Sequence, residues 1–127
     1  SIFSLNKIAV VGMSANTNRP SYQIGFYLKE QGYNIYPVNP NCDKIDELKC
    51  FSNLNEIKDS IDIINIFRHP DHVLPIVNDS IKINPKVIWF QDGVVNCEAI
   101  DLANKNGIQT IVNDCIYRRH KVYINSN

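Results

Sequence analysis

The stretch Val10–Gly25, VVGMSANTNRPSYQIG, decides how the rest of the chain is interpreted. It begins with β-branched residues and Gly12, which is how a first strand ends at a nucleotide-binding turn. The dinucleotide fingerprint requires two further glycines, but here polar residues and an Arg-Pro-Ser occupy their places. The stretch therefore predicts a strand, a polar turn and a helix that bind a ligand other than an ordinary dinucleotide.

Around this stretch, short β-branched runs alternate with amphipathic segments, a pattern typical of βαβ units on a parallel sheet. The connection 42–55 is polar, with a short strand expected at 49–51 and one helical turn near 54–58. The main strands are expected at 7–12, 34–38, 62–68, 87–90 and 109–112, and the helices at 20–31, 70–83 and 97–106.

These elements predict one α/β domain over 1–127, Rossmann-like, with a five-stranded parallel sheet and helices on both faces. Numbering the five strands along the chain, the simplest order is 3-2-1-4-5. In that order the chain reverses between strands 1 and 4, and a ligand crevice is expected at their carboxyl ends. The segments that meet there are 12–21, 38–41, 67–70 and 90–93.

The totals exclude several classes of protein. A chain of 127 residues has the size of one domain, and its 13 basic side chains balance its 13 acidic ones, which gives no general case for nucleic acid or membrane binding. Without an apolar run of membrane-spanning length or a secretion signal, we expect a cytoplasmic protein. The four cysteines lack zinc-site spacing and are expected to be free thiols.

The first turn carries groups suited to an anion. The N-terminus of a helix favours phosphate through its unpaired N–H groups and its dipole. Arg19 adds a planar, positively charged guanidinium group suited to phosphate. The alternative is a capped turn with a solvated arginine. The side chains that could add hydrogen bonds are Ser14, Asn16, Thr17 and Ser21.

The end of the second strand narrows the choice of ligand. Dinucleotide-binding folds usually place an acidic residue there to bind ribose hydroxyls, whereas this chain has Val38-Asn39-Pro40-Asn41, with Lys44 nearby. A carboxylate would repel a phosphorylated ribose, but neutral amides and a lysine would not. Coenzyme A (CoA), with its 3′-phosphate, and NADP both satisfy this argument.

Several motifs together resemble a known family. VVGMS with RPSY, then YPVNP, FRHP, VIWFQDGVVN and TIVNDCI resemble, over residues 7–122, the small stand-alone CoA-binding proteins related to the CoA-binding domain of succinyl-CoA synthetase α-subunits. The resemblance implies a pyrophosphate at the first turn, an adenosine part at the second strand end and a pantetheine path along the later motifs. The residues expected at the ligand are Gly12, Ser14, Asn16, Arg19, Pro20, Ser21, Val38, Asn39, Pro40, Lys44, Phe67, Arg68, His69, Pro70, Gln91, Gly93, Asn113 and Cys115.

The sequence departs from the resembled proteins in two ways. The synthetases use a phosphorylated histidine of a second domain that this sequence does not contain, so ligase activity is not expected. Arg119 stands before His120, where the small proteins would have an acidic residue. We expect a non-catalytic module that binds or senses CoA or a short acyl-CoA, with its protein partner unspecified. The alternative is a hydrolase, transferase or NADP-linked reductase in the same crevice, with Asp92 or Asp114 activating water.

The histidines, Cys115 and Trp89 each have a structural alternative to a functional role. His69 and His72, with Asp71 between them, lack an evident third ligand, so no metal site is expected; His69 either contacts a phosphate or has no role. Cys115 could form a mixed disulfide with the CoA thiol, or it could be a buried small residue. Trp89 lies within a strand and is expected in the core.

Overall fold

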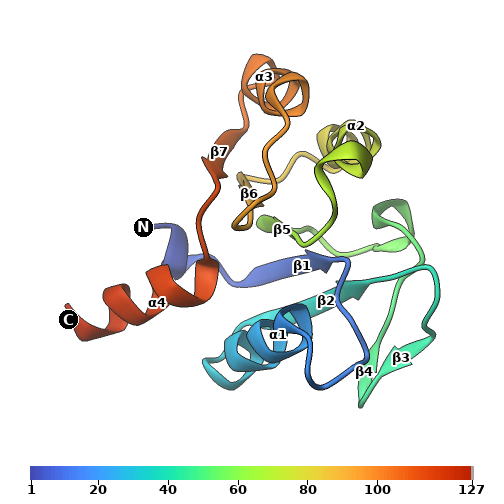
Figure 1. The fold of residues 1–127 in the computed structure, drawn as a ribbon, viewed down its shortest axis with the longest axis vertical. Coiled ribbons are helices and arrows are strands. Elements are labelled where there is room, and N and C mark those ends of the chain that lie inside the picture. Colours follow the sequence, from blue (N-terminus) through green and yellow to red (C-terminus); the bar gives the residue numbers. More distant parts are fainter. Residues whose placement is uncertain (127) are drawn as a thin grey trace.

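A parallel sheet forms the centre of the protein in the computed structural model, which describes residues 1–126 (Figure 1). Its five strands lie in the order β2-β1-β5-β6-β7, and all neighbours are parallel. The fold class, a Rossmann-like α/β sheet with helices on both faces, is confirmed. The strand bounds are Lys7–Val11 for β1, Asn34–Val38 for β2, Ile63–Ile66 for β5, Val87–Phe90 for β6 and Gln109–Val112 for β7.

The neighbours of the central strand differ from the expected order. Counted along the chain, the five parallel strands lie 2-1-3-4-5, so β5 pairs with β1 where the sequence interpretation placed the strand at 87–90. All four residues of β5 are buried, as suits a strand with neighbours on both sides. An apolar run shows that both faces of a strand are covered, but it does not show which strand lies beside it. The chain therefore reverses direction between β1 and β5.

Helices cover the two faces of the sheet in pairs (Figure 1). α1 and α4 lie against one face, and α2 and α3 against the other. α4, which follows β7, was not anticipated from the sequence. The helix bounds are Pro20–Glu30 for α1, Val73–Ile83 for α2, Cys97–Lys105 for α3 and Ile116–Asn125 for α4, and none of the helices described here is long and apolar enough to cross a membrane.

Short elements occupy the connections. The polar connection after β2 forms an antiparallel ribbon, and Phe51 just beyond it bridges to Val38, so the strand expected at 49–51 is present in part. The helix expected from residue 70 begins as a separate turn. The bounds are Ile2–Ser4 for η1, Lys44–Ile45 for β3, Leu48–Lys49 for β4, Leu54–Glu56 for η2 and Pro70–His72 for η3.

Side chains alternate between two cores along the strands. Val11 and Ile66 pack toward α2 and α3, whereas Val10 and Ile63 pack toward α1 and α4. Trp89 lies in the second core, as expected, fully buried and with its indole Nε1 donating to the carbonyl of Asp114 at 2.8 Å. This bond fixes the start of α4 to the carboxyl end of β6.

Candidate functional site

Two cavities meet at the carboxyl edge of the sheet, and both are lined by Gly12 and Arg68. We call them the α2-side cavity, of about 290 Å³, and the α1-side cavity, of about 420 Å³. The other residues of the α2-side cavity are Val11, Val38, Pro40, Ser52, Asn53, Leu54, His72, Ile76 and Asp79. The other residues of the α1-side cavity are Ser14, Arg19, Pro20, Ser21, Ile24, Phe67, Gln91, Asp92, Val94 and Cys115.

Gly12 forms the junction of the two cavities. Its N–H donates to the carbonyl of Val38 at 2.8 Å, and its φ of +86° lies in the region that favours glycine. A Cβ atom at this position would lie 2.3 Å from the carbonyl oxygen of Phe67 and 2.9 Å from Cδ of Arg68. The carboxyl ends of β1 and β5 therefore approach each other too closely for any other residue, and a ligand lying over this point faces backbone.

The polar side chains of the first turn hydrogen bond to the turn itself. Ser21 Oγ accepts from the N–H of Ser14 at 2.9 Å, and Ser14 Oγ accepts from the N–H of Asn16 at 3.0 Å. Asn16 does not line either cavity. No side chain within the described structure caps the first turn of α1, which starts with Pro20 after Arg19. The turn is thus stabilised by its own hydrogen bonds. The N-terminus of α1 keeps the free backbone N–H groups that attract anions.

Asn39 joins two segments rather than lining a cavity. Its Nδ2 donates to the carbonyl of Met13 at 3.0 Å, and its Oδ1 accepts from the N–H of Asn41 at 2.9 Å. This side chain holds the first turn against the end of β2. Lys44 lies in β3 opposite Lys49, outside both cavities.

The segment after β5 contributes unequally to the site. Arg68 lines both cavities, and Phe67 lines the α1-side cavity. His69 lies outside both cavities, and its Nδ1 accepts from the N–H of Asp71 at 3.1 Å, which caps η3. The carbonyl of Pro70 accepts from Nδ2 of Asn96 at 3.0 Å, so this residue has a structural partner.

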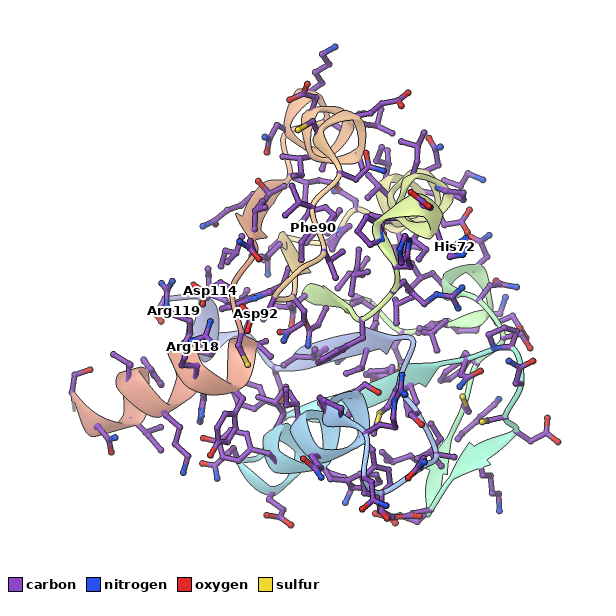
Figure 2. All side chains as sticks on the ribbon, viewed as in Figure 1. His72, Phe90, Asp92, Asp114, Arg118 and Arg119 are labelled. Atoms are coloured by element: carbon purple, nitrogen blue, oxygen red, sulfur yellow. The ribbon has the colours of Figure 1, made fainter. Side chains whose placement is uncertain are left out.

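His72 lines the α2-side cavity, although the sequence interpretation treated it only as a metal candidate. Figure 2 shows it on the α2 side of the molecule, away from the charged residues at the start of α4. Among residues 1–126, no group of three or more His, Cys, Asp or Glu side chains could hold a metal ion.

Gln91 and Cys115 lie together in the wall of the α1-side cavity. Gln91 is 4% exposed, and its Oε1 accepts from the N–H of Ile116 at 2.9 Å, while its Nε2 has no partner among the residues described. Cys115 is 8% exposed. The wall therefore presents one unpaired amide donor beside a thiol.

Gly93 and Asn113 join neighbouring strand ends without lining a cavity. The N–H of Gly93 donates to Oδ1 of Asn113 at 2.8 Å, and both residues have positive φ, +78° and +55°. Their contact holds the loop after β6 against the end of β7.

Four charged residues form a chain of ion pairs at the start of α4 (Figure 2). The two terminal guanidinium nitrogens of Arg118 donate to Asp92, at 3.0 Å each, and Arg118 and Arg119 donate to Asp114 at 3.0 and 2.5 Å. Partial burial opposes ionisation of Asp114, but hydrogen bonds from Arg119, the Cys115 N–H and Arg118 hold its pKa below the usual value. Both carboxylates are thus engaged with arginine, which disfavours a role as the base that activates water.

His120 lies on the buried side of α4 and contacts α1 rather than the junction of the cavities. It is 3% exposed, and its Nδ1 is 2.7 Å from the hydroxyl of Tyr27 on α1. Burial, with a smaller contribution from Lys121, lowers the pKa of this histidine. In the Arg119-His120 pair, where this chain departs from the resembled proteins, Arg119 therefore contacts Asp114 and His120 contacts α1.

Asn65 is a polar residue inside the second core. It is fully buried, and neither atom of its amide group has a hydrogen-bond partner among the described residues. The strand register places it between Val10 and Trp89. It lies on the same face of β5 as Phe67, one row inward from the α1-side cavity.

Sequence reasoning missed several lining residues. Ile24 follows Ser21 at helical spacing, a signal that could have been used. Ser52 and Asn53 follow the bridge of Phe51 to β2, and only the folded chain brings them to the α2-side cavity.

One family model and several known proteins match most of this chain. A family model described as CoA binding domain matches residues 6–121. The Bacillus subtilis (strain 168) protein named uncharacterized protein YneT is 35% identical over 116 residues, which are 91% of this chain and 86% of that protein. A solved structure of a hypothetical protein from Pyrococcus horikoshii OT3 superposes with a TM-score of 0.92 at 34% identity, covering 94% of this chain and 84% of that one.

A larger relative shares only this region. An acetate–CoA ligase (ADP-forming) II of Archaeoglobus fulgidus is 40% identical over 78 residues, which are 60% of this chain but 11% of the ligase. The chain is therefore similar to a small part of that enzyme.

Proposed function

The chain belongs to the CoA binding domain family, and from this premise we propose that it binds CoA or a short acyl-CoA across the two cavities without catalysing a reaction. The observation that carries the proposal is the meeting of two cavities over Gly12 and Arg68. CoA has a charged centre between a nucleoside and a long amide-containing arm. A pair of cavities with a cation and exposed backbone at their junction suits that shape.

The nucleoside end belongs in the α2-side cavity. Val38, Pro40, Leu54 and Ile76 give this cavity apolar walls for a flat base. The pyrophosphate lies over Gly12, where Arg68 and the N-terminus of α1 supply positive potential.

The arm of the ligand belongs in the α1-side cavity. Ile24, Phe67 and Val94 provide apolar contact, and Nε2 of Gln91 offers a donor to a carbonyl of the arm or of a thioester. Cys115 lines the same cavity, and the thiol or thioester end lies toward it.

Support for a binding role without chemistry comes from the acidic residues. Asp92 lines the α1-side cavity, but its carboxylate receives two hydrogen bonds from Arg118. Asp114 is similarly bound by Arg118 and Arg119. A carboxylate held by arginine is a weak general base, so the expected role is to hold, sense or present the cofactor.

Two measurements test the proposal. Native mass spectrometry of the protein purified without added ligand should show the mass of CoA or an acyl-CoA, and an NADP mass would overturn it. Calorimetry should give about tenfold or more tighter binding of CoA than of dephospho-CoA, because charge-assisted contacts to the 3′-phosphate contribute roughly 1.5–3 kcal/mol each. Equal affinities would contradict this assignment.

The absence of chemistry has its own test. Acetyl-CoA incubated with the protein should release no more free thiol than acetyl-CoA alone, as followed with a thiol-reactive dye. Release that depends on the protein and is lost in Asp92→Asn would favour a hydrolase.

A further inference from the structure

The ribbon formed by residues 42–50 carries two cysteines that neither cavity uses. Cys50 is 7% exposed, whereas Cys42 is only partly buried, and both are free thiols. Both pack against the core that α1 covers. The ribbon thus places one accessible thiol and one protected thiol in the same small region.

Backbone contacts bring the two cysteines close together. The N–H of Cys50 donates to the carbonyl of Asp43 at 2.9 Å, so Cys50 lies opposite the residue that follows Cys42. The carbonyl oxygen of Asn39 is 3.3 Å from the backbone nitrogen of Cys42 and 3.5 Å from Sγ of Cys50. Cys42 therefore lies one residue beyond the position opposite Cys50. The shared Asn39 carbonyl and the packing of both side chains in one core bring the two cysteines near each other, as a disulfide requires.

The electrostatics agree with this proximity. Burial raises the pKa of the Cys50 thiol, and the neighbouring Cys42 adds to this shift. The two thiols are therefore within electrostatic reach, and the more exposed Cys42 is the better attacking group.

Asn39 connects this pair to the crevice. Its backbone carbonyl receives the Cys50 thiol, and its side chain holds the carbonyl of Met13 at 3.0 Å. Its neighbour Pro40 lines the α2-side cavity. A change at the sulfur of Cys50 is thus transmitted through one residue to the first turn and to a cavity wall.

We propose that Cys42 and Cys50 form a reversible disulfide and that its formation weakens ligand binding in the crevice, the second part resting on the proposed function. The oxidant is a low-molecular-weight disulfide. The Cys42 thiolate attacks one of its sulfurs and expels a thiolate, leaving a mixed disulfide on Cys42. Cys50 then loses its proton to solvent, its thiolate attacks the Cys42 sulfur, and the second small thiolate leaves. The two protein thiols are oxidised by two electrons, and the small disulfide is reduced to two thiols.

The disulfide removes an interaction that the reduced protein makes. Once bonded to Cys42, Sγ of Cys50 no longer donates to the Asn39 carbonyl. Asn39, which holds the first turn through its side chain, then loses the hydrogen bond that Cys50 makes to its backbone. We expect ligand affinity to fall roughly two- to tenfold, the effect of one such contact.

Oxidised glutathione followed by intact-mass measurement and peptide mapping tests the chemical part. The expected product has lost two hydrogens, gives a peptide linking Cys42 to Cys50, and reverts with dithiothreitol. Cys50→Ser should instead retain glutathione on Cys42, whereas Cys97→Ser, which replaces an exposed cysteine, should behave as the wild type. A stable glutathione adduct on wild-type Cys42, or a link to Cys97, would overturn the disulfide.

Calorimetry with CoA on the reduced and oxidised protein tests the regulatory part. The oxidised wild type should bind more weakly, and Cys42→Ser should bind equally before and after treatment with the oxidant. A disulfide that forms without changing the affinity overturns the regulation alone. Failure of the reduced protein to bind CoA overturns the proposed function and the regulation with it, while the mapping still decides the disulfide.

Discussion

The two cavities share Gly12 and Arg68, but their polar side chains are used differently. In the α1-side cavity, Ser14, Ser21 and Asp92 already hydrogen bond within the protein. In the α2-side cavity, the side chains of Ser52 and Asn53 make no hydrogen bond with any residue in 1–126. Before a ligand arrives, the α1 side therefore leaves Nε2 of Gln91 without a partner, whereas the α2 side leaves the side chains of Ser52 and Asn53.

This difference predicts that substitutions in the two cavities affect stability and binding differently. Removing the hydroxyl of Ser21 should disturb the fold as well as binding, because the partly buried N–H of Ser14 is left unpaired. Removing a polar group on the α2 side should affect binding alone.

The largest effect should come from the junction that both cavities share. Gly12→Ala should abolish detectable CoA binding by calorimetry, because its Cβ would meet the backbone of Phe67 at 2.3 Å. It should also lower the free energy of unfolding more than Gly32→Ala does. Gly32 has a φ of +101°, but a Cβ added there would have nothing within 4 Å, so it controls for the backbone strain of about 1–2 kcal/mol. Equal binding by both variants would place the ligand elsewhere.

Arg68→Ala should weaken CoA binding about tenfold to a hundredfold, because it removes the cation that both cavities share. Lys44→Ala, which changes a lysine outside both cavities, is the matched control and should bind as the wild type. A larger loss in the lysine variant would restore the 3′-phosphate role that the sequence suggested for Lys44.

A pair of variants tests the contrast between the walls directly. Ser21→Ala leaves the N–H of Ser14 without its acceptor and should lower the free energy of unfolding by about 1–3 kcal/mol. Asn53→Ala should leave the unfolding midpoint unchanged and weaken CoA binding about two- to tenfold. The contrast between the two walls is wrong if both variants show the same change in unfolding midpoint and the same change in CoA affinity.

Occupancy of the α1-side cavity can be followed at Cys115. This buried thiol should react slowly with iodoacetamide and more slowly still with CoA bound, as read by peptide mass spectrometry. Cys97 is exposed and outside both cavities, so its labelling should not depend on CoA. Protection of Cys97 alone would contradict the placement of the arm.

The smallest effect should be a pH dependence that acts through α4 on the α1 side. The pKa of His120 is below its usual 6.5 in the folded protein, so its contribution to stability is complete above about pH 6.5 and is lost as the pH falls through the folded pKa. Thermal melts between about pH 7.5 and 5.5 should show this slope in the wild type and in His69→Gln, whose histidine is exposed. The slope should be reduced in His120→Gln.

Much of the fold could be predicted because each strand is a compact β-branched run. Asn34–Val38 and Gln109–Val112 match the expected bounds, and Pro20 starts α1 as a proline in a first turn does. The neighbour of β1 could not be predicted, because apolar runs report covered faces and not lateral partners. α4 was missed because its first turn carries Arg118 and Arg119, which oppose the helix dipole, and one of the carboxylates that balance them, Asp92, reaches them only in the folded chain.

The lining of the cavities was predicted best for residues within two positions of the end of a central strand. Gly12, Arg68 and Gln91 lie at the carboxyl edge because the strands before them end there. Asn39 also follows a strand directly, but its side-chain amide bonds to Met13. Lys44 is six residues beyond β2, and the ribbon carries it outside both cavities. Sequence distance does not reveal which way a loop turns.

The β1–β5 pairing also bears on folding kinetics. The two strands are separated along the chain by α1, β2 and the ribbon, so their contact closes a long loop, an event that is slow compared with forming local structure. Gly12 and Phe67 approach each other only after that loop has closed. A chain whose synthesis stops before Ile63 contains only one half of the crevice and cannot bind the ligand. A ligand seated at the junction selects chains with the completed sheet, and its concentration sets how far the unfolding midpoint rises.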